Sequence, residues 1–137
     1  MKNKILNYQS LNTDLATLLL RLIFGCLFVH YGFTKLISYN EILPKFPDLI
    51  GIGSKLSFIL VIFAELFCGF FVAIGFLTRL TVIPIFITMN VVFFIALANQ
   101  TFQERTLSFV FLILSIIIFI LGSGKFSIDR LILKITN

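Results

Sequence analysis

Four long apolar runs divide this sequence, and they constrain its fold more than any other feature. A helix needs about 20 apolar residues to cross the hydrocarbon core of a bilayer. The runs of roughly this kind cover residues 15–37, 56–77, 80–98 and 106–121, and the short last run is expected to extend into its polar flanks. The sequence therefore predicts an all-α fold, a four-helix transmembrane bundle, as a single domain over residues 1–137.

The composition excludes most soluble classes of protein. Hydrophobic residues make up 59% of the chain and charged residues only 12%, far from the make-up of a soluble domain. The net charge of +5 is scattered between apolar runs and forms no basic stripe, which favours membrane lipids over nucleic acid as partners. Both cysteines lie inside apolar runs without a metal-ligand spacing, so no metal site is predicted.

The connections and the basic residues predict the topology. Residues 77–80 leave room only for a tight antiparallel hairpin, whereas residues 38–54 form a longer loop that lies on the membrane or caps the bundle. Basic residues that flank the spans favour the cytoplasmic side. The side with both termini carries Lys2, Lys4, Arg21, Arg79, Lys125, Arg130 and Lys134, and the other side carries Lys35, Lys45, Lys55 and Arg105. Both termini are therefore expected in the cytoplasm.

The ends of the helical region carry two local signals. Asp14 is a candidate N-cap of the first helix, because a carboxylate accepts hydrogen bonds from free backbone amides. After residues 122–124 the chain alternates between apolar and basic positions at helical spacing. This pattern predicts a short amphipathic helix at the membrane interface, with Ser127 as its N-cap and Asp129 at its positive end. Its basic side chains, and that of Lys125, are expected to reach lipid headgroups.

Glu65 stands near the centre of the second apolar run. A carboxylate at that depth costs about 2.5–3.5 kcal/mol even on an insertion scale, so it must be neutralised, paired or used. The other strongly polar side chains inside or beside apolar runs are His30, Arg21, Lys35 and Asn90.

Depth along the predicted helices brings one polar residue from each helix towards a common layer. With a rise of about 1.5 Å per residue, this layer contains His30, Glu65, Asn90 and Ser115, with Thr88 nearby. In one interpretation His30 and Glu65 exchange protons with a membrane-soluble ligand such as a quinone, and Asn90, Thr88, Ser115 and Lys35 bind it. In the other, these side chains only hydrogen-bond across the bundle and fix its register.

One face of the first helix predicts a packing seam. This face carries Arg21, Gly25, Phe28, Gly32 and Lys35, while His30 points roughly the opposite way. The two glycines allow another helix to approach closely, and Gly69 gives the second span a similar seam. Arg21 is expected to meet the turn at Arg79 or a lipid phosphate.

Motifs along nearly the whole chain match the pattern of a known family. They are Leu20-Arg21-Leu22, Gly25, His30-Tyr31-Gly32, Lys35-Leu36, Ala64-Glu65-Leu66, Gly69, Gly75-Phe76-Leu77-Thr78-Arg79, Met89 and the closing run Gly122-Ser123-Gly124-Lys125-Phe126-Ser127-Ile128-Asp129-Arg130. With these motifs the chain resembles the DoxX family of four-helix bacterial membrane proteins. Relatives in this family often place a second histidine where this chain has Ala98-Asn99-Gln100, so two-histidine chemistry is not expected.

The resemblance implies a location and two functions. Relatives include a subunit of thiosulfate:quinone oxidoreductase and proteins of membrane oxidative-stress complexes, which implies a redox-associated or quinone-linked subunit in the bacterial cytoplasmic membrane. Quinone is then the expected cofactor, with a membrane-associated redox enzyme or a second copy of the chain as partner. Distant eukaryotic relatives act as membrane chaperones or cargo receptors, which implies a non-catalytic scaffold, chaperone or small-solute handling protein instead. Both a catalytic and a non-catalytic role are compatible with the sequence.

Overall fold

The computed structural model describes residues 6–137, and it confirms the all-α fold class. Four helices are long and apolar enough to cross a membrane, namely Thr13–Ile37, Ser54–Ile74, Thr78–Ala96 and Phe102–Leu121. The fourth begins within the polar flank of its apolar run, as its short apolar length predicts. Lys2 and Lys4, which contribute to the predicted orientation, lie outside the described residues.

Two of the spans contain π-helical segments. The first span is the single helix α1 (Thr13–Ile37), followed by the short helices α2 (Tyr39–Ile42) and η2 (Leu43–Lys45). The second span consists of α3 (Ser54–Ile62), the π-helix η3 (Phe63–Cys68) and α4 (Gly69–Ile74). The third consists of α5 (Thr78–Val91) and the π-helix η4 (Val92–Ala96), the fourth is α6 (Phe102–Leu121), and α7 (Ile128–Thr136) follows.

The cap of α1 differs from the prediction. Oδ1 of Asn12 accepts a hydrogen bond from the amide of Leu15 at 3.0 Å, so Asn12 is the N-cap. Asp14 lies in the first turn, and its Oδ1 accepts from the amide of Lys125 at 3.1 Å. The carboxylate therefore joins the start of α1 to the segment before α7, because that segment offers an amide within its reach.

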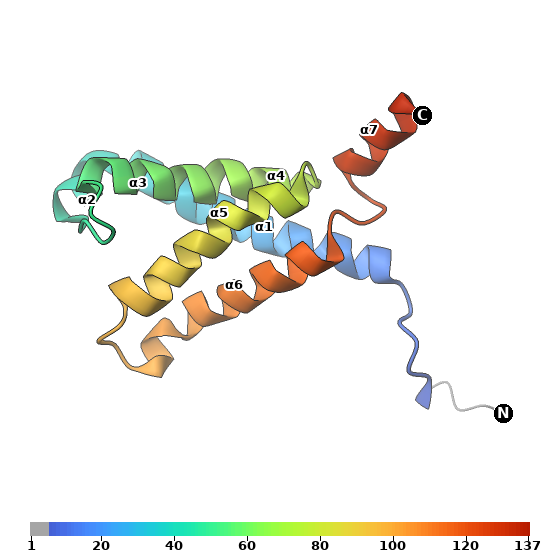
Figure 1. Cartoon of the computed structure of the whole chain (residues 1–137), viewed down its shortest axis with the longest axis horizontal. Coiled ribbons are helices and arrows are strands. Elements are labelled where there is room, and N and C mark those ends of the chain that lie inside the picture. The colour runs from blue at the N-terminus through green and yellow to red at the C-terminus, as the bar shows by residue number, and fades with distance from the viewer. Residues whose placement is uncertain (1–5) are drawn as a thin grey trace.

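Close backbone contact joins α1 to the second span. A Cβ atom on Gly25 would lie 2.5 Å from the carbonyl oxygen of Gly69, and one on Gly32 would lie 2.6 Å from the amide nitrogen of Leu66. Any larger residue at these positions would push the two helices apart. Figure 1 shows the result, with α1 alongside the second span over most of its length.

The third and fourth spans form a second pair, and the two pairs diverge towards the end that carries α2. Figure 1 shows α5 and α6 side by side and at an angle to the first pair. The two pairs meet through a core of buried side chains that includes Phe24, Phe28, Val72, Ile85 and Phe111. Aromatic rings fill much of its centre, with the rings of Phe28 and Phe111 4.8 Å apart between centroids.

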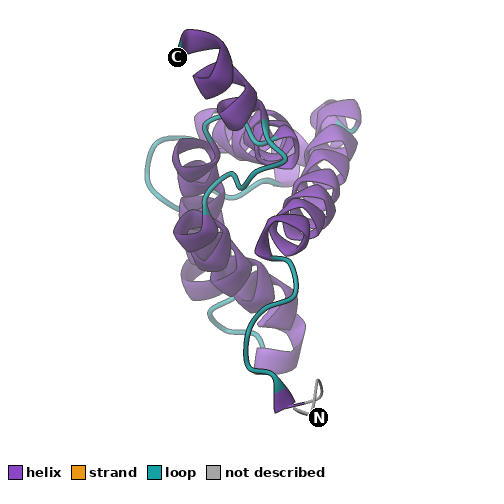
Figure 2. Cartoon of the chain, turned by 90° about the vertical axis from the view of Figure 1, so that its right-hand side faces the viewer, coloured by secondary structure: helices purple, strands orange, loops and turns teal. Residues whose placement is uncertain are grey.

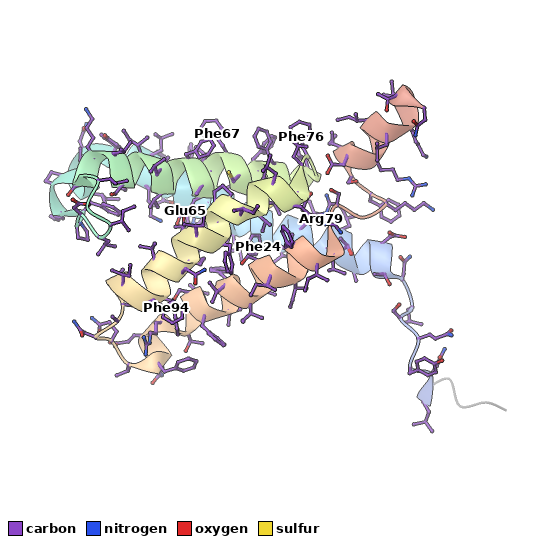
Figure 3. All side chains as sticks on the ribbon, viewed as in Figure 1. Phe24, Glu65, Phe67, Phe76, Arg79 and Phe94 are labelled. Atoms are coloured by element: carbon purple, nitrogen blue, oxygen red, sulfur yellow. The ribbon has the colours of Figure 1, made fainter. Side chains whose placement is uncertain are left out.

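The outer surface of the bundle is apolar, and α7 stands apart from it. Phe67 is 53% exposed and points away from the other helices in Figure 3. Such a surface suits lipid, where apolar side chains cost nothing to expose. In Figure 2, which looks at the end of the bundle bearing α7, this helix projects beyond the four long helices.

Candidate functional site

Glu65 lies in the π-helix η3, at the point where the second span faces the inside of the bundle. Its side chain is only 6% exposed, and Figure 3 shows it directed between the helices. A π-helical turn inserts an extra residue into a helix and is frequent at functional sites. The wider turn changes the direction in which its side chains point. Regular helical spacing therefore does not predict which way the Glu65 side chain points.

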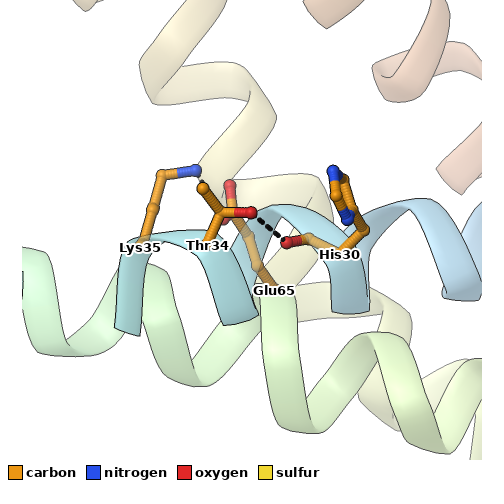
Figure 4. A network of polar contacts seen from close by, with 4 residues as sticks. All are labelled: His30, Thr34, Lys35 and Glu65. Atoms are coloured by element: carbon orange, nitrogen blue, oxygen red, sulfur yellow. Dashed lines mark hydrogen bonds and ion pairs between the residues drawn. The ribbon is translucent and has the colours of Figure 1, made fainter. Parts of the chain in front are cut away.

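Lys35 is the partner of Glu65. Nζ of Lys35 donates to Oε2 of Glu65 at 2.7 Å, which makes a salt bridge between α1 and η3 (Figure 4). The Lys35 side chain is 29% exposed, and its Nζ also lies 5.9 Å from the centroid of the Tyr31 ring. An opposite charge at this distance offsets the free-energy cost of removing the carboxylate from water. A carboxylate without a partner in this position would bear that cost in full.

A cavity of about 510 Å³ adjoins this ion pair, in the space between the two diverging helix pairs. Its walls are mostly apolar and come from all four spans. The charged and polar residues on the walls are Tyr31, Lys35, Ser57, Glu65, Thr88, Glu104 and Ser108. An apolar cavity with a few polar groups is the usual form of a small-molecule site.

The loop between the first two spans covers one end of the cavity. Phe46, Leu49 and Ile50 contribute to its walls, so this loop caps the bundle, one of the two positions predicted for it. Oδ1 of Asp48 holds the turn by accepting from the amides of Gly51 and Ile52 at 3.0 and 3.1 Å.

Hydroxyl groups on the cavity walls differ in their hydrogen bonding. Thr88 donates to the carbonyl of Pro84 at 2.8 Å, and Ser108 donates to the carbonyl of Arg105 at 2.8 Å. Ser57 is buried, and its Oγ has no hydrogen-bond partner among the described residues. Because buried polar atoms are normally paired, Ser57 is a candidate ligand contact. Nothing in the sequence marks Ser57 as a ligand contact, since one serine in an apolar run carries no signal.

The layer predicted around His30 does not form. His30 is exposed on α1, and within residues 6–137 its imidazole makes no hydrogen bond to Glu65. Its backbone carbonyl accepts a hydrogen bond from the hydroxyl of Thr34 at 2.9 Å (Figure 4). The reason is angular, since residues two apart on a helix point about 200° away from each other. Gly32 packs against η3, and His30 therefore faces outward.

The other members of the predicted layer bond within their own helices. Asn90 donates to the carbonyl of Phe86 at 2.9 Å, and Ser115 donates to the carbonyl of Leu112 at 2.6 Å. Neither residue lines the cavity. Of the residues predicted to bind a ligand, the structure brings Lys35 and Thr88 to the cavity walls, together with Glu65.

The basic residues at the opposite end contact backbone carbonyls. Arg21 is 1% exposed, and its Nη2 donates to the carbonyl of Phe126. Its guanidinium also packs against the turn before Arg79, as expected, because a Cβ atom on Gly75 would lie 3.0 Å from Cζ of Arg21. Arg79 donates from Nε to the carbonyl of Phe119 at 3.0 Å and from Nη2 to that of Ile120 at 3.3 Å. It therefore caps the last turn of α6.

Asp129 fastens α7 to the hairpin between the second and third spans. Oδ1 accepts from the amide of Leu77 at 2.8 Å, and Oδ2 accepts from the amide of Thr78 at 3.5 Å and from the hydroxyl of Ser123. The amide of Asp129 also donates to the carbonyl of Gly75 at 3.1 Å. The carboxylate thus satisfies free amides at the N-terminus of α5, which explains why an acidic residue suits this position.

The N-cap of α7 is Ser127, as the sequence predicts. Oγ of Ser127 accepts from the amide of Arg130 at 3.3 Å and caps the helix. The helix is amphipathic, with Arg130 exposed on it and Lys125 exposed just before it. Residues 6–137 contain no group of three or more His, Cys, Asp or Glu side chains placed to hold a metal ion.

The fold and the site define a class, a multi-pass helical membrane protein with a buried ion pair beside an apolar cavity. Within that class, the chain belongs to the DoxX family, whose model matches residues 16–98. The match contains Lys35, Ser57 and Glu65 and ends before the closing segment that Asp129 fastens. No curated protein and no solved structure shows a significant match to the chain.

Proposed function

We propose that this protein binds a quinone in the cavity beside Lys35 and Glu65, as a redox-associated subunit of a complex in the bacterial cytoplasmic membrane. The observation that carries the proposal is the ion pair on the wall of a mostly apolar cavity. A quinone combines an apolar ring and tail with carbonyl oxygens that accept hydrogen bonds, and this site offers a complement to each part.

The ion pair supplies a donor and a proton-exchanging group. The ammonium of Lys35 hydrogen-bonds a quinone oxygen and gives it a proton when the quinone is reduced. Glu65, whose Oε2 lies 2.7 Å from Nζ of Lys35, takes up protons from the water phase one at a time and returns them to the lysine. Reduction of one quinone to the quinol consumes two electrons and two protons. The partner redox enzyme supplies the electrons, and this chain binds the quinone and handles its protons.

The charges at the two ends of the bundle support an orientation with both termini in the cytoplasm. Arg79, Lys125, Arg130 and Lys134 gather around α7, and basic residues concentrate on the cytoplasmic side of membrane proteins. The cavity and its covering loop then lie towards the outer leaflet.

Direct binding tests the proposal. The full chain is purified in lipid nanodiscs, and a short-tailed quinone analogue is titrated against the wild type, Glu65→Gln and Lys35→Met. Lys55→Met serves as control, since Lys55 is exposed on the same side of the bundle and does not line the cavity. Saturable binding by the wild type and Lys55→Met, lost or weakened at least tenfold in both cavity variants, supports the proposal. Absence of binding to the wild type, or equal binding by folded cavity variants, refutes it.

The exposed face of α1 favours a second candidate, a non-catalytic scaffold, chaperone or small-solute handling protein. His30 lies on that face, and a polar side chain exposed to lipid is commonly satisfied by another transmembrane helix. Under this alternative, replacement of His30 changes the assembly of the protein on native gels, whereas replacement of Glu65 leaves it unchanged. Unaltered assembly of His30→Leu removes the support for the second candidate.

A further inference from the structure

A second hollow lies at the other end of the molecule, where α7 meets the hairpin between α4 and α5. This groove has a volume of about 1200 Å³ and lies between residues 76–80 on one side and α7 on the other. Figure 2 looks at this end of the bundle and shows α7 standing away from the long helices. The groove shares no residue with the cavity beside Glu65.

The side chains that line the groove are mainly basic among those that carry charge. Arg79, Arg130 and Lys134 line it, against the single acidic residue Asp129. The carboxylate of Asp129 is occupied by the amides of Leu77 and Thr78 and by the hydroxyl of Ser123. Its charge offsets at most one of the three cations, so the groove keeps a net positive charge.

Two of the three cations are free to bind a ligand. Arg130 and Lys134 are exposed, and within residues 6–137 their side chains form neither an ion pair nor a hydrogen bond. Arg79 uses Nε and Nη2 on carbonyls of α6 and keeps Nη1 available. The groove thus carries three cations against the one carboxylate of Asp129, a net positive charge that favours an anion.

Apolar side chains line the same groove. Leu77 and Leu80 lie on the hairpin and are exposed, and Ile132 and Leu133 lie on α7 and are also exposed. A small free anion makes no favourable contact with these apolar side chains. A phospholipid has both a phosphate for the cations and acyl chains for the apolar surface. Arginine and lysine near a membrane surface bind anionic lipid headgroups through their charge.

We infer that this groove is a binding site for an anionic phospholipid. The phosphate lies among Arg79, Arg130 and Lys134, and the acyl chains follow Leu80 along the outside of the third span into the bilayer. The bound lipid connects α7 to the hairpin and fixes the interfacial helix against the membrane. This inference does not depend on quinone binding at the cavity.

Lipid competition in native mass spectrometry tests the inference. The full chain is exchanged into equal amounts of phosphatidylglycerol and phosphatidylcholine, and the lipids that stay bound are counted for the wild type, Arg130→Gln, Lys134→Gln and the double variant. Lys125→Gln is the matched control, because Lys125 is exposed at the same end but does not line the groove. At about 1 kcal/mol for each cation, the double variant should lose roughly 30-fold in preference for phosphatidylglycerol.

The outcomes separate a built site from general attraction. Preferential retention of phosphatidylglycerol by the wild type and Lys125→Gln, reduced in each single variant and most in the folded double variant, supports the inference. Equal retention of both lipids by the wild type overturns it, and so does a loss in Lys125→Gln as large as in the double variant. Displacement of the lipid by millimolar inorganic phosphate also overturns it, since the groove would then recognise a free anion.

Discussion

Nζ of Lys35 and Oε2 of Glu65 lie 2.7 Å apart, and this contact joins two spans whose residues are 30 positions apart in the chain. The two partners differ in environment, because the Lys35 side chain is 29% exposed and the Glu65 side chain 6%. Both residues line the cavity, but Glu65 depends on Lys35 for compensation of its charge. This asymmetry determines what each substitution should do.

Lys35→Met should destabilise the protein more than the double variant Lys35→Met/Glu65→Gln. The single change leaves a buried carboxylate without a counterion, which costs about 3–5 kcal/mol, whereas replacement of both charges is often close to neutral. The free energies of unfolding of both variants are measured in mixed micelles, with the helical circular dichroism signal as the probe of unfolding. Lys55→Met controls for loss of a basic residue on the same side. Additive effects of the two substitutions would show that the pair is not coupled.

Gly25→Val should weaken the contact between α1 and the second span. The new Cβ would lie 2.5 Å from the carbonyl oxygen of Gly69, and overpacking of this kind typically costs about 1–3 kcal/mol. The same unfolding measurement detects the loss. Cys26→Val is the neighbouring control, since Cys26 is exposed and should tolerate the change. A stability equal to that of the wild type would contradict the close approach.

Ser57→Ala should weaken binding of the quinone analogue without lowering stability. The buried Oγ has no protein partner among the described residues, so its removal breaks no internal hydrogen bond, and Ser57 lines the cavity. Loss of a bond to ligand costs about 0.5–1.5 kcal/mol in binding free energy. Ser108→Ala is the matched control, because Ser108 lines the same cavity but donates to the carbonyl of Arg105. Equal affinities of the two variants would exclude Ser57 as a contact.

The fold could be predicted from the sequence because the length of an apolar run is a property of the chain alone. The start of α7 was also predictable, since Ser127 caps it through a local hydrogen bond. The partner of Glu65 was harder to predict, because the depth of a residue in the membrane does not determine which side of its helix it lies on. His30 has a suitable depth but faces away from Gly32.

The pairing of Lys35 with Glu65 could be predicted in part from the sequence. It shares a helical face with Gly32, which packs against Leu66 beside Glu65, and its long side chain spans the remaining difference in depth. The π-helix η3 was not predictable, since no residue in Phe63–Cys68 signals it. The anchor Asp129 was predicted only at the start of its own helix, because its bonds to Leu77 and Thr78 depend on the packing of distant segments.

Asp129→Asn should loosen the join between α7 and the hairpin. Asparagine places an NH2 group, which donates and cannot accept, where the carboxylate has its second oxygen, so in the present geometry either the amide of Leu77 or that of Thr78 faces another donor. Hydrogen–deuterium exchange should become faster at Leu77 and Thr78 while the centre of α6 stays protected. Glu41→Gln is the control, since Glu41 is exposed and its side chain is not bonded within residues 6–137. Unchanged exchange at Leu77 would show that Asp129 does not fasten the hairpin.

His30→Leu should leave both quinone binding and stability as in the wild type. The imidazole is exposed on α1 and makes no contact with the carboxylate of Glu65, and leucine suits a surface that faces lipid. The titration used for Glu65→Gln and the unfolding measurement apply without change. Glu65→Gln is the positive control, because it alters the cavity wall while the overall shape of the side chain is kept. Tenfold weaker binding in His30→Leu would place the imidazole in the site and require α1 to rotate when ligand binds, since Gly32 now holds the opposite face against the second span.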